Sequence, residues 1–494
     1  MIASEFTVFA KSGGPLTKRI SLEANGSLRS DGSACVMAQG SARRVRIANV
    51  HDLCALIECM RPNEALALGA LRAGLADSVQ VVTRHKLNGA PNVIARTGTD
   101  IVYRKGQPAL ALLDFDTKGM PEDTAAALCQ HGGYWPALVA VLPELQTIAR
   151  VTRRSTSAGL FRSDTGRRLP GSDGVHVYVA VQDGTDIERF LKTLHSRCWL
   201  AGLGWMMVGA GGQLLERSIV DRMVGTPERL VFEGDPILDP PLRQDKESRR
   251  PIAVEGDALD TVVVCPPLTV IEISRLRELK AKAAHRLAGD SAKARAAFID
   301  RQAKRLAEAK GISTKEAARV VARQCDGVLL PNLALPFDDE EFAGCTVAEV
   351  LADPARFEGA TLADPLEGTD YGVCKAKVMR RADGSVWVHS FAHGCTVYEL
   401  KLNAAAVRAA IEHADEGAVV KLFIDLAVAA DLDDEELEGL RNLAAERTGI
   451  NRRTISGMLK AAFEKKDRPA RPRDARPPAR RAPRPAAADR GSAP

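Results

Sequence analysis

The chain lacks several features that would place it in well-defined protein classes. Its ten cysteines include no CxxC pair and no secretory signal opens the sequence, so we expect reduced thiols and a cytoplasmic location. No apolar run reaches the roughly 20 residues that a membrane-spanning helix needs, so we expect no membrane insertion. A GxxxxGK(S/T) phosphate-binding loop is also missing, because the glycine cluster at 209–212 has no lysine.

Length and composition suit an ordinary multidomain protein. The 494 residues fit about two to four domains, and an apolar fraction of 45% can supply buried cores. The formal net charge of +5 is small, but Lys and Arg gather between Arg275 and Lys310 and again beyond Lys465. These are the stretches that would attract a polyanion.

Two carboxylates end an apolar run. Asp114-Phe115-Asp116 follows Ala109-Leu110-Ala111-Leu112-Leu113, which predicts a buried β-strand. Because strand side chains alternate between faces, Asp114 and Asp116 should project together while Phe115 turns away. A divalent cation between them would remove their repulsion, and oxygen ligands suit Mg²⁺ or Mn²⁺. The alternative is a pair of ordinary loop acids.

Further polar residues follow downstream. The segment at 155–159 is rich in Ser, Thr and Gly and is either a phosphate-binding loop, with Ser155 and Ser157 as ligands, or a plain turn. Val175–Val179 alternates as a strand with His176 on one face, where a histidine is either functional or structural. Asp221 lies in an apolar segment and is either a third metal-binding carboxylate or the partner of a neighbouring arginine.

At this point the chain resembles the archaeo-eukaryotic primase superfamily, in particular the primase-polymerases of plasmids, phages and integrative elements. Three motifs carry the resemblance: the acid-x-acid strand end at 114–116, Gly174-Val175-His176, and Ile219-Val220-Asp221. The segment 227–233, Pro-Glu-Arg-Leu-Val-Phe-Glu, also looks like the text that follows the third acid in these relatives. The resemblance covers about the first half of the chain.

The resemblance implies a two-metal DNA primase/polymerase that joins nucleoside triphosphates on a single-stranded DNA template during mobile-element replication. Asp114, Asp116 and Asp221 would hold Mg²⁺ or Mn²⁺, and His176 would contact the triphosphate. Lys118 and Arg222 could supply further positive charge for nucleotide binding. Since no ATPase loop is present, unwinding should come from a separate replicative helicase. The alternative is a non-catalytic DNA-binding replication-initiation protein with a primase-like fold.

The pattern of elements predicts an α+β catalytic domain over 1–255. The expected strands are 79–82, 93–95, the strand ending at Asp114, the His176 strand and 229–232. Helices are expected over 51–59 and 186–195, the second with a capping box formed by Thr185 and Glu188. A mixed sheet should carry the acid pair.

The remainder is expected to form four parts. Residues 266–335 predict a basic helical domain that either follows a nucleic-acid backbone or is a solvated charged surface, with Ser313 and Glu316 capping a second helix. Residues 336–402 predict a small α+β unit with a turn at Asp383-Gly384, whose histidines are satisfied by hydrogen bonds. Residues 403–466 predict a helical unit resembling a helix-turn-helix, and 467–494 a disordered basic tail. A zinc site in the small unit is the less favoured alternative, and its ligands would be Cys374, His389, His393 and Cys395.

Overall fold

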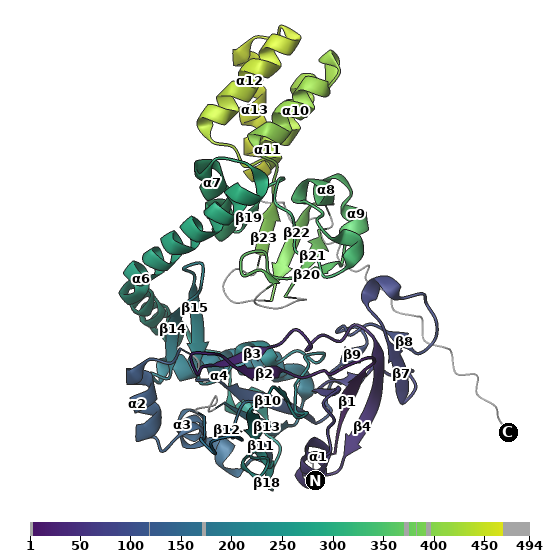
Figure 1. The fold of residues 1–494 in the computed structure, drawn as a ribbon, viewed down its shortest axis with the longest axis vertical. Helices are drawn as coiled ribbons and strands as arrows, with labels where there is room; N and C mark the ends of the chain where they lie inside the picture. The colour runs from purple at the N-terminus through teal and green to yellow at the C-terminus, as the bar shows by residue number, and fades with distance from the viewer. Residues whose placement is uncertain are drawn as a thin grey trace, which may run out of the picture. The chain divides into compact units, whose positions relative to one another are not determined.

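The computed structural model describes residues 3–117, 119–169, 174–369, 375–381, 383–391 and 397–467. The chain divides into two compact units, Met1–Leu400 and Lys401–Pro494. Helices and several mixed sheets confirm the predicted α+β class (Figure 1). The first unit thus contains the predicted catalytic domain together with residues 266–400. No helix among the described ranges is long and apolar enough to cross a bilayer.

A four-stranded antiparallel sheet forms the centre of the N-terminal region, so the prediction that a mixed sheet carries the acid pair is wrong for this sheet. Its order is β10 (Ala109–Phe115), β13 (Val175–Val181), β11 (Arg150–Arg154) and β18 (Ile252–Val254). The apolar run of β10 is almost wholly buried and packs with β13 in the largest core of the chain. This confirms the buried strand that the apolar run predicts, and Asp114 lies at its carboxyl end.

A second sheet has the order β5 (Glu64–Ala67), β1 (Ser4–Lys11), β4 (Gly40–Ile47), β7 (Ser78–Val81) and β8 (Val93–Ile94). The strands predicted at 79–82 and 93–95 are therefore confirmed within a residue. The strand predicted at 229–232 is wrong: only Val231 forms an isolated bridge, to Leu66. Its neighbours do not continue the pairing, although the segment is apolar enough to suggest a strand.

Short ribbons complete this region. They are β2 (Arg19–Leu22) with β3 (Leu28–Asp31) and β16 (Ile237–Leu238), β6 (Ala70–Leu71) with β9 (Ile101–Val102), β12 (Leu160–Arg162) with β17 (Leu242–Gln244), and β14 (Gly204–Val208) with β15 (Leu214–Ser218). A small core of Ile20, Leu160 and Leu242 packs the β2–β3 hairpin against the β12–β17 ribbon.

Helices cover the sheets: α1 (Val50–Glu58), α2 (Glu122–Gln130), α3 (Tyr134–Val141), α4 (Ile187–Leu200) and α5 (Thr261–Val264). The helix predicted at 51–59 is confirmed as α1, with Asn49 as its N-cap. The capping box predicted for the second helix is wrong. Asp183 instead accepts the Thr185 amide in a 3₁₀ turn that precedes α4. Asp183 accepts from both the amide and the hydroxyl of Thr185, so neither group is left to form the capping box with Glu188.

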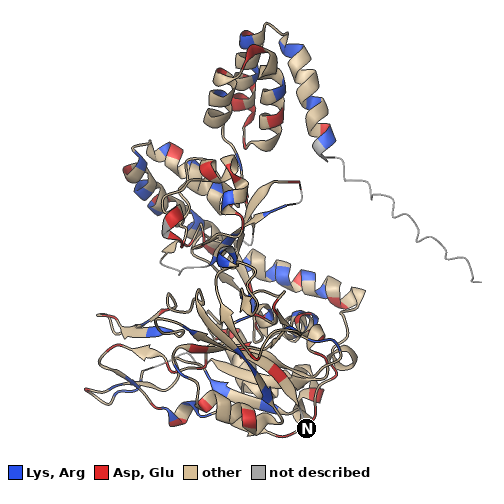
Figure 2. Ribbon diagram, turned by 90° about the vertical axis from the view of Figure 1, so that its right-hand side faces the viewer, with Lys and Arg blue, Asp and Glu red and all other residues tan. Residues whose placement is uncertain are grey.

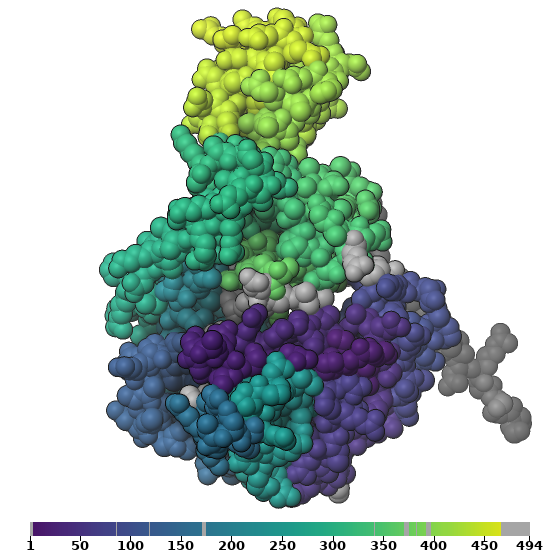
Figure 3. Space-filling view, in the orientation of Figure 1, coloured from purple at the N-terminus to yellow at the C-terminus, as the bar shows by residue number. Residues whose placement is uncertain are grey.

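The basic segment forms two helices, α6 (Val270–Lys310) and α7 (Thr314–Cys325). Thr269 and Glu272 form a capping box at the start of α6, and Gly311 ends it in the left-handed conformation that glycine adopts without strain. Ser313 accepts the Glu316 amide, so the predicted second cap is confirmed. Bands of Lys and Arg repeat along α6 (Figure 2), and its surface lies open along much of its length (Figure 3).

The glycine cluster at 209–212 forms the tip of the β14–β15 hairpin. Ser291 of α6 donates a hydrogen bond to the Gly212 carbonyl at 2.5 Å. Gln213 donates to Glu367 at 3.4 Å, and an added Cβ on Gly211 would lie 2.8 Å from Leu366. The cluster therefore allows close approach between three parts of the fold, which explains its glycines without a phosphate ligand.

Residues 328–400 contain a five-stranded sheet of order β19 (Val328–Leu329), β23 (Val397–Leu400), β22 (Val386–Ser390), β21 (Ala376–Arg380) and β20 (Thr361–Leu362), with α8 (Val347–Ala352) and α9 (Pro354–Phe357). The turn predicted at Asp383-Gly384 joins β21 to β22, and Asp383 accepts the Ser385 amide.

The histidines of this unit were predicted to be satisfied by hydrogen bonds. Among the described residues, the buried Nδ1 of His389 has no such partner, and its ring instead makes edge contacts with Trp387 and Phe391. The expectation is therefore wrong for His389 within these residues, because aromatic packing takes the place of a polar partner. Cys374, His393 and Cys395 lie outside the described residues.

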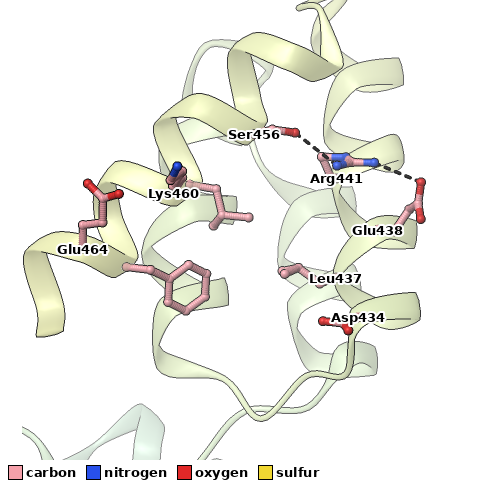
Figure 4. A pocket seen from close by; sticks show the side chains of 9 residues that line it. Asp434, Leu437, Glu438, Arg441, Ser456, Lys460 and Glu464 are labelled. Atoms are coloured by element: carbon pink, nitrogen blue, oxygen red, sulfur yellow. Dashed lines mark hydrogen bonds and ion pairs between the residues drawn. The ribbon is translucent and has the colours of Figure 1, made fainter.

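The second unit is helical: α10 (Ala404–His413), α11 (Val419–Ala429), α12 (Asp434–Thr448) and α13 (Arg452–Asp467). Asp433 and Glu436 form a capping box on α12, and Gly449 ends that helix in the left-handed conformation before the turn into α13. A groove between α12 and α13 is lined by Leu437, Leu459 and Phe463 with charged residues around them (Figure 4). The predicted tail at 467–494 lies outside the described residues from 468 onward.

Candidate functional site at the end of the central sheet

A polar row crosses one face of the central sheet. Asp114 on β10 pairs directly with His176 on β13, and His176 pairs with Arg153 on β11. Directly paired residues of antiparallel strands share a face, so these three side chains lie side by side. Asp114 Oδ1 is 3.7 Å from His176 Nε2. Phe115 points the other way and stacks on Tyr134, with ring centroids 4.3 Å apart.

Glu233 lies buried against this row. One of its oxygens, Oε1, is 2.6 Å from His176 Nδ1 and 2.5 Å from the Tyr178 hydroxyl. The other, Oε2, accepts from the Arg153 guanidinium at 3.1 Å. Arg249 adds a second guanidinium at 4.0 Å. Both oxygens of a fully buried carboxylate are therefore occupied, as the cost of burying a charge requires.

The charges around His176 determine its protonation. Burial by itself lowers the pKa of His176, but the carboxylates of Glu233 and Asp114 outweigh burial, so the pKa is raised. For Glu233, burial raises the pKa, and His176 and Arg153 reverse the effect to leave the pKa lowered. The imidazole thus lies between two carboxylates and favours its cationic form.

The pKa of Asp114 depends on a different combination of burial and neighbouring charges. Burial raises the pKa of its carboxyl, His176 opposes that rise, and the negative charges of Asp221 and Asp116 add to it, so the pKa is raised overall. The structure therefore places Asp116 and Asp221 close enough to Asp114 for their charges to act on it. Like charges gathered in this way disfavour ionisation unless a cation joins them.

Asp221 reaches Asp114 through the backbone. Its amide donates to the Asp114 carbonyl at 3.1 Å, and its side chain caps a 3₁₀ turn by accepting the Met223 amide. Just before it, the Val220 carbonyl accepts from His195 Nδ1 at 2.9 Å, beside the hydroxyl of Ser218. Burial lowers the pKa of His195 to about 4, so this imidazole is neutral and holds the turn that carries Asp221.

The Ser155 loop lies at the same end of the sheet. The Ser155 amide donates to the Gly174 carbonyl, and the Ser155 and Ser157 hydroxyls are 3.3 Å apart. A Cβ on Gly174 would lie 3.0 Å from the Phe115 carbonyl, so glycine permits the close approach of this loop to the acid-bearing strand. Ser155 and Ser157 thus lie one strand beyond His176, near the acids.

The basic side chains that were predicted to supply positive charge for nucleotide binding differ in where they lie. Arg222 binds Glu216 at 2.8 Å, and Lys280 of α6 binds the same carboxylate at 2.8 Å. Lys118 lies outside the described residues. Lys18, just before β2, is exposed, and its charge acts on both Asp114 and His176. It was not among the predicted site residues.

Sequence reasoning also missed Glu233 and Arg153 as members of the site. Glu233 closes the segment 227–233 that carries part of the resemblance, but neither residue has a local pattern that shows its partner. Arg153 is 80 residues from Glu233 in the chain. A buried strand arginine does need an anionic partner, and that is the signal that could have prompted a search for an acid.

No protein-family model matches this chain, and no curated protein or solved structure matches it.

Proposed function

We propose that this protein is a template-dependent DNA primase/polymerase that joins nucleoside triphosphates on single-stranded DNA. The observation that supports it most is the convergence of Asp114, His176 and the Asp221 turn at one end of the central sheet. Asp116 follows β10 directly, and its charge also acts on Asp114. Acids and an imidazole in this order and position fit the primase resemblance.

The predicted carboxylate ligands are suited to a divalent metal ion that enters the site together with the nucleotide. Within the described ranges, no group of three or more His, Cys, Asp or Glu side chains is arranged to hold a metal ion, so the proposal requires phosphate oxygens of the nucleotide to complete the coordination. Mg²⁺ is commonly held by one or two carboxylates plus substrate phosphates, so Asp114, Asp116 and Asp221 would supply the protein's share. Bound Mg²⁺ or Mn²⁺ would activate the primer 3′-hydroxyl and neutralise the leaving pyrophosphate.

The remaining residues have roles that follow from their charge and position. The cationic imidazole of His176 would pair with the triphosphate, oriented by Glu233 behind it. The Ser155 and Ser157 hydroxyls would donate to phosphate oxygens. Exposed Lys18 would add positive charge, whereas Arg222 would first have to leave Glu216. A separate helicase would open duplex DNA, and mobile-element replication is the setting that the resemblance suggests.

Primer extension on single-stranded DNA with Mg²⁺ or Mn²⁺ tests the proposal. We expect Asp114→Asn and Asp116→Asn each to lower incorporation to below about one hundredth of wild type, because each removes a charged metal ligand. DNA binding should persist. Asp290→Asn, an exposed acid on α6, is the matched control and should extend primers normally.

Two outcomes would contradict the catalytic assignment. Wild-type protein that binds DNA but extends no primer with either metal would favour the non-catalytic replication-initiation alternative. Extension that survives Asp114→Asn would instead place the chemistry elsewhere.

A further inference from the structure

The β12–β17 ribbon carries a half-buried aromatic side chain between two arginines. Phe161 on β12 pairs with Arg243 on β17 and forms a bridge with Arg168 on its other side. Directly paired residues of antiparallel strands project from the same face. The three side chains therefore form a row across the ribbon.

The opposite face of the ribbon is the buried one. Leu160 and Leu242, the chain neighbours of Phe161 and Arg243, are buried in the small core with Ile20. Because side chains alternate along a strand, Phe161 and Arg243 must point away from that core. Phe161 also belongs to none of the hydrophobic clusters that the described residues form.

The charge of this face is positive. Arg243 is exposed, and Arg168 is 80% exposed with a 3.4 Å contact to the half-buried Asp245. Exposed pairs of this kind contribute little and exchange readily for another anion.

The ribbon is tied to the candidate site. Gln244 of β17 donates to the carbonyls of Thr156 and Ala158 in the Ser155 loop, at 2.9 and 2.7 Å. Gly159 has φ +69°, and an added Cβ would lie 2.1 Å from Ser248, so the loop must approach the segment after β17 closely. Phe161 is six positions after Ser155, a span of at most about 20 Å.

We infer that Phe161, Arg168 and Arg243 form a binding surface for single-stranded nucleic acid, next to the candidate site. A base would stack on Phe161 and the flanking phosphates would bind the two arginines, which is the combination that single strands require. Duplex bases are already stacked and would not engage Phe161. The identification of this strand as the template rests on the proposed function. If that function holds, the surface would hold the template strand beside the Ser155 loop.

Fluorescence anisotropy with the full chain and a labelled oligo(dT) of about 20 nucleotides tests the inference. We expect Phe161→Ala to weaken single-strand binding roughly tenfold without changing its salt dependence, because stacking releases no counterions. Arg243→Gln should reduce the slope of log affinity against log salt by about 0.7. Duplex binding should change little in Phe161→Ala.

Matched controls separate the surface from general effects. Phe391→Ala removes a phenylalanine that is 56% exposed on another sheet, and Arg162→Gln removes an arginine of the same ribbon that binds Asp164. Both should bind like wild type. Circular dichroism should show that Phe161→Ala and Arg243→Gln remain folded. Phe161→Leu, which keeps most of the apolar volume but no aromatic ring, should lose binding as well.

The binding readout does not depend on catalysis. Loss of single-strand affinity in Phe161→Ala supports the surface even if the wild type extends no primer, in which case only the proposed function fails. Unchanged affinity in Phe161→Ala, or an equal loss on duplex DNA, overturns the surface even if the wild type extends primers.

Discussion

The imidazole of His176 donates from Nδ1 to the buried carboxylate of Glu233, 57 residues further along the chain, at 2.6 Å. This contact leaves Nε2 directed toward Asp114 at 3.7 Å. The histidine is therefore fixed in one orientation, with its charge available at the end of the sheet where a triphosphate would bind.

Replacing Glu233 should change the pH dependence of activity. Glu233→Gln removes a carboxylate that raises the pKa of His176, so the imidazole should lose its proton at lower pH. We expect the alkaline limb of the primer-extension profile to move down by about one pH unit. NMR titration of His176 should show the same shift.

Tyr178→Phe is the control for this change, because it removes a hydrogen bond to Glu233 but no charge. Its pH profile should stay close to wild type. The raised pKa of His176 also contributes to the stability of the fold. This contribution is fully present below the unfolded pKa near 6.5 and is lost as the pH rises through the folded pKa. An unchanged alkaline limb in Glu233→Gln would contradict the orienting role.

His195 should make the fold sensitive to acid. Its pKa of about 4 lies below the ordinary 6.5, so the unfolded chain binds a proton that the folded chain does not. Stability should therefore fall as pH drops from about 6.5 to 4, by roughly 3 kcal/mol in total.

Urea unfolding at several pH values measures this effect. His195→Gln should flatten the dependence, although it also weakens the contact with the Val220 carbonyl. His413→Gln, which replaces an exposed histidine, should keep the wild-type dependence. Equal pH dependence in wild type and His195→Gln would show that another group controls acid unfolding.

The exposed face of α6 should carry part of the DNA affinity. Arg275, Lys282 and Arg286 are exposed and recur at seven- and four-residue steps, which places them on one side of the helix. If they contact phosphates, replacing all three with glutamine should reduce the salt slope of single-strand binding by roughly 2.

Lys304→Gln is the control, since its ammonium already binds Asp300 at 2.9 Å. It should alter the slope little. A triple variant that binds with the wild-type slope would identify this face as a solvated surface, which is the alternative that the sequence leaves open.

Local features of the fold were predictable from sequence, and non-local ones were not. The β10 run, α1 and the Ser313 cap depend on residues within one element, so their patterns are visible in the chain. Val231 is apolar and strand-like, but the pairing of its neighbours depends on partners far away. The Thr185 cap failed because Asp183, two residues earlier, competes for the same amide.

The same distinction holds for the site. Asp114, His176 and Asp221 stand out because each ends or interrupts an apolar segment. Their mutual approach is a consequence of sheet register, which short motifs do not specify. Glu233 and Arg153 form a pair across 80 residues, so only the folded chain shows that they support the histidine.

The glycine-rich tip of the β14–β15 hairpin has a consequence for how this protein can be divided. The hairpin leads within three residues from Ser218 to Asp221, while its tip is hydrogen-bonded to two later residues of the chain, Gly212 to Ser291 and Gln213 to Glu367. A fragment cut near residue 255 would leave that tip without its supports. We therefore expect the turn that carries Asp221 to lose part of its support when the N-terminal region is produced without the residues that follow it in sequence.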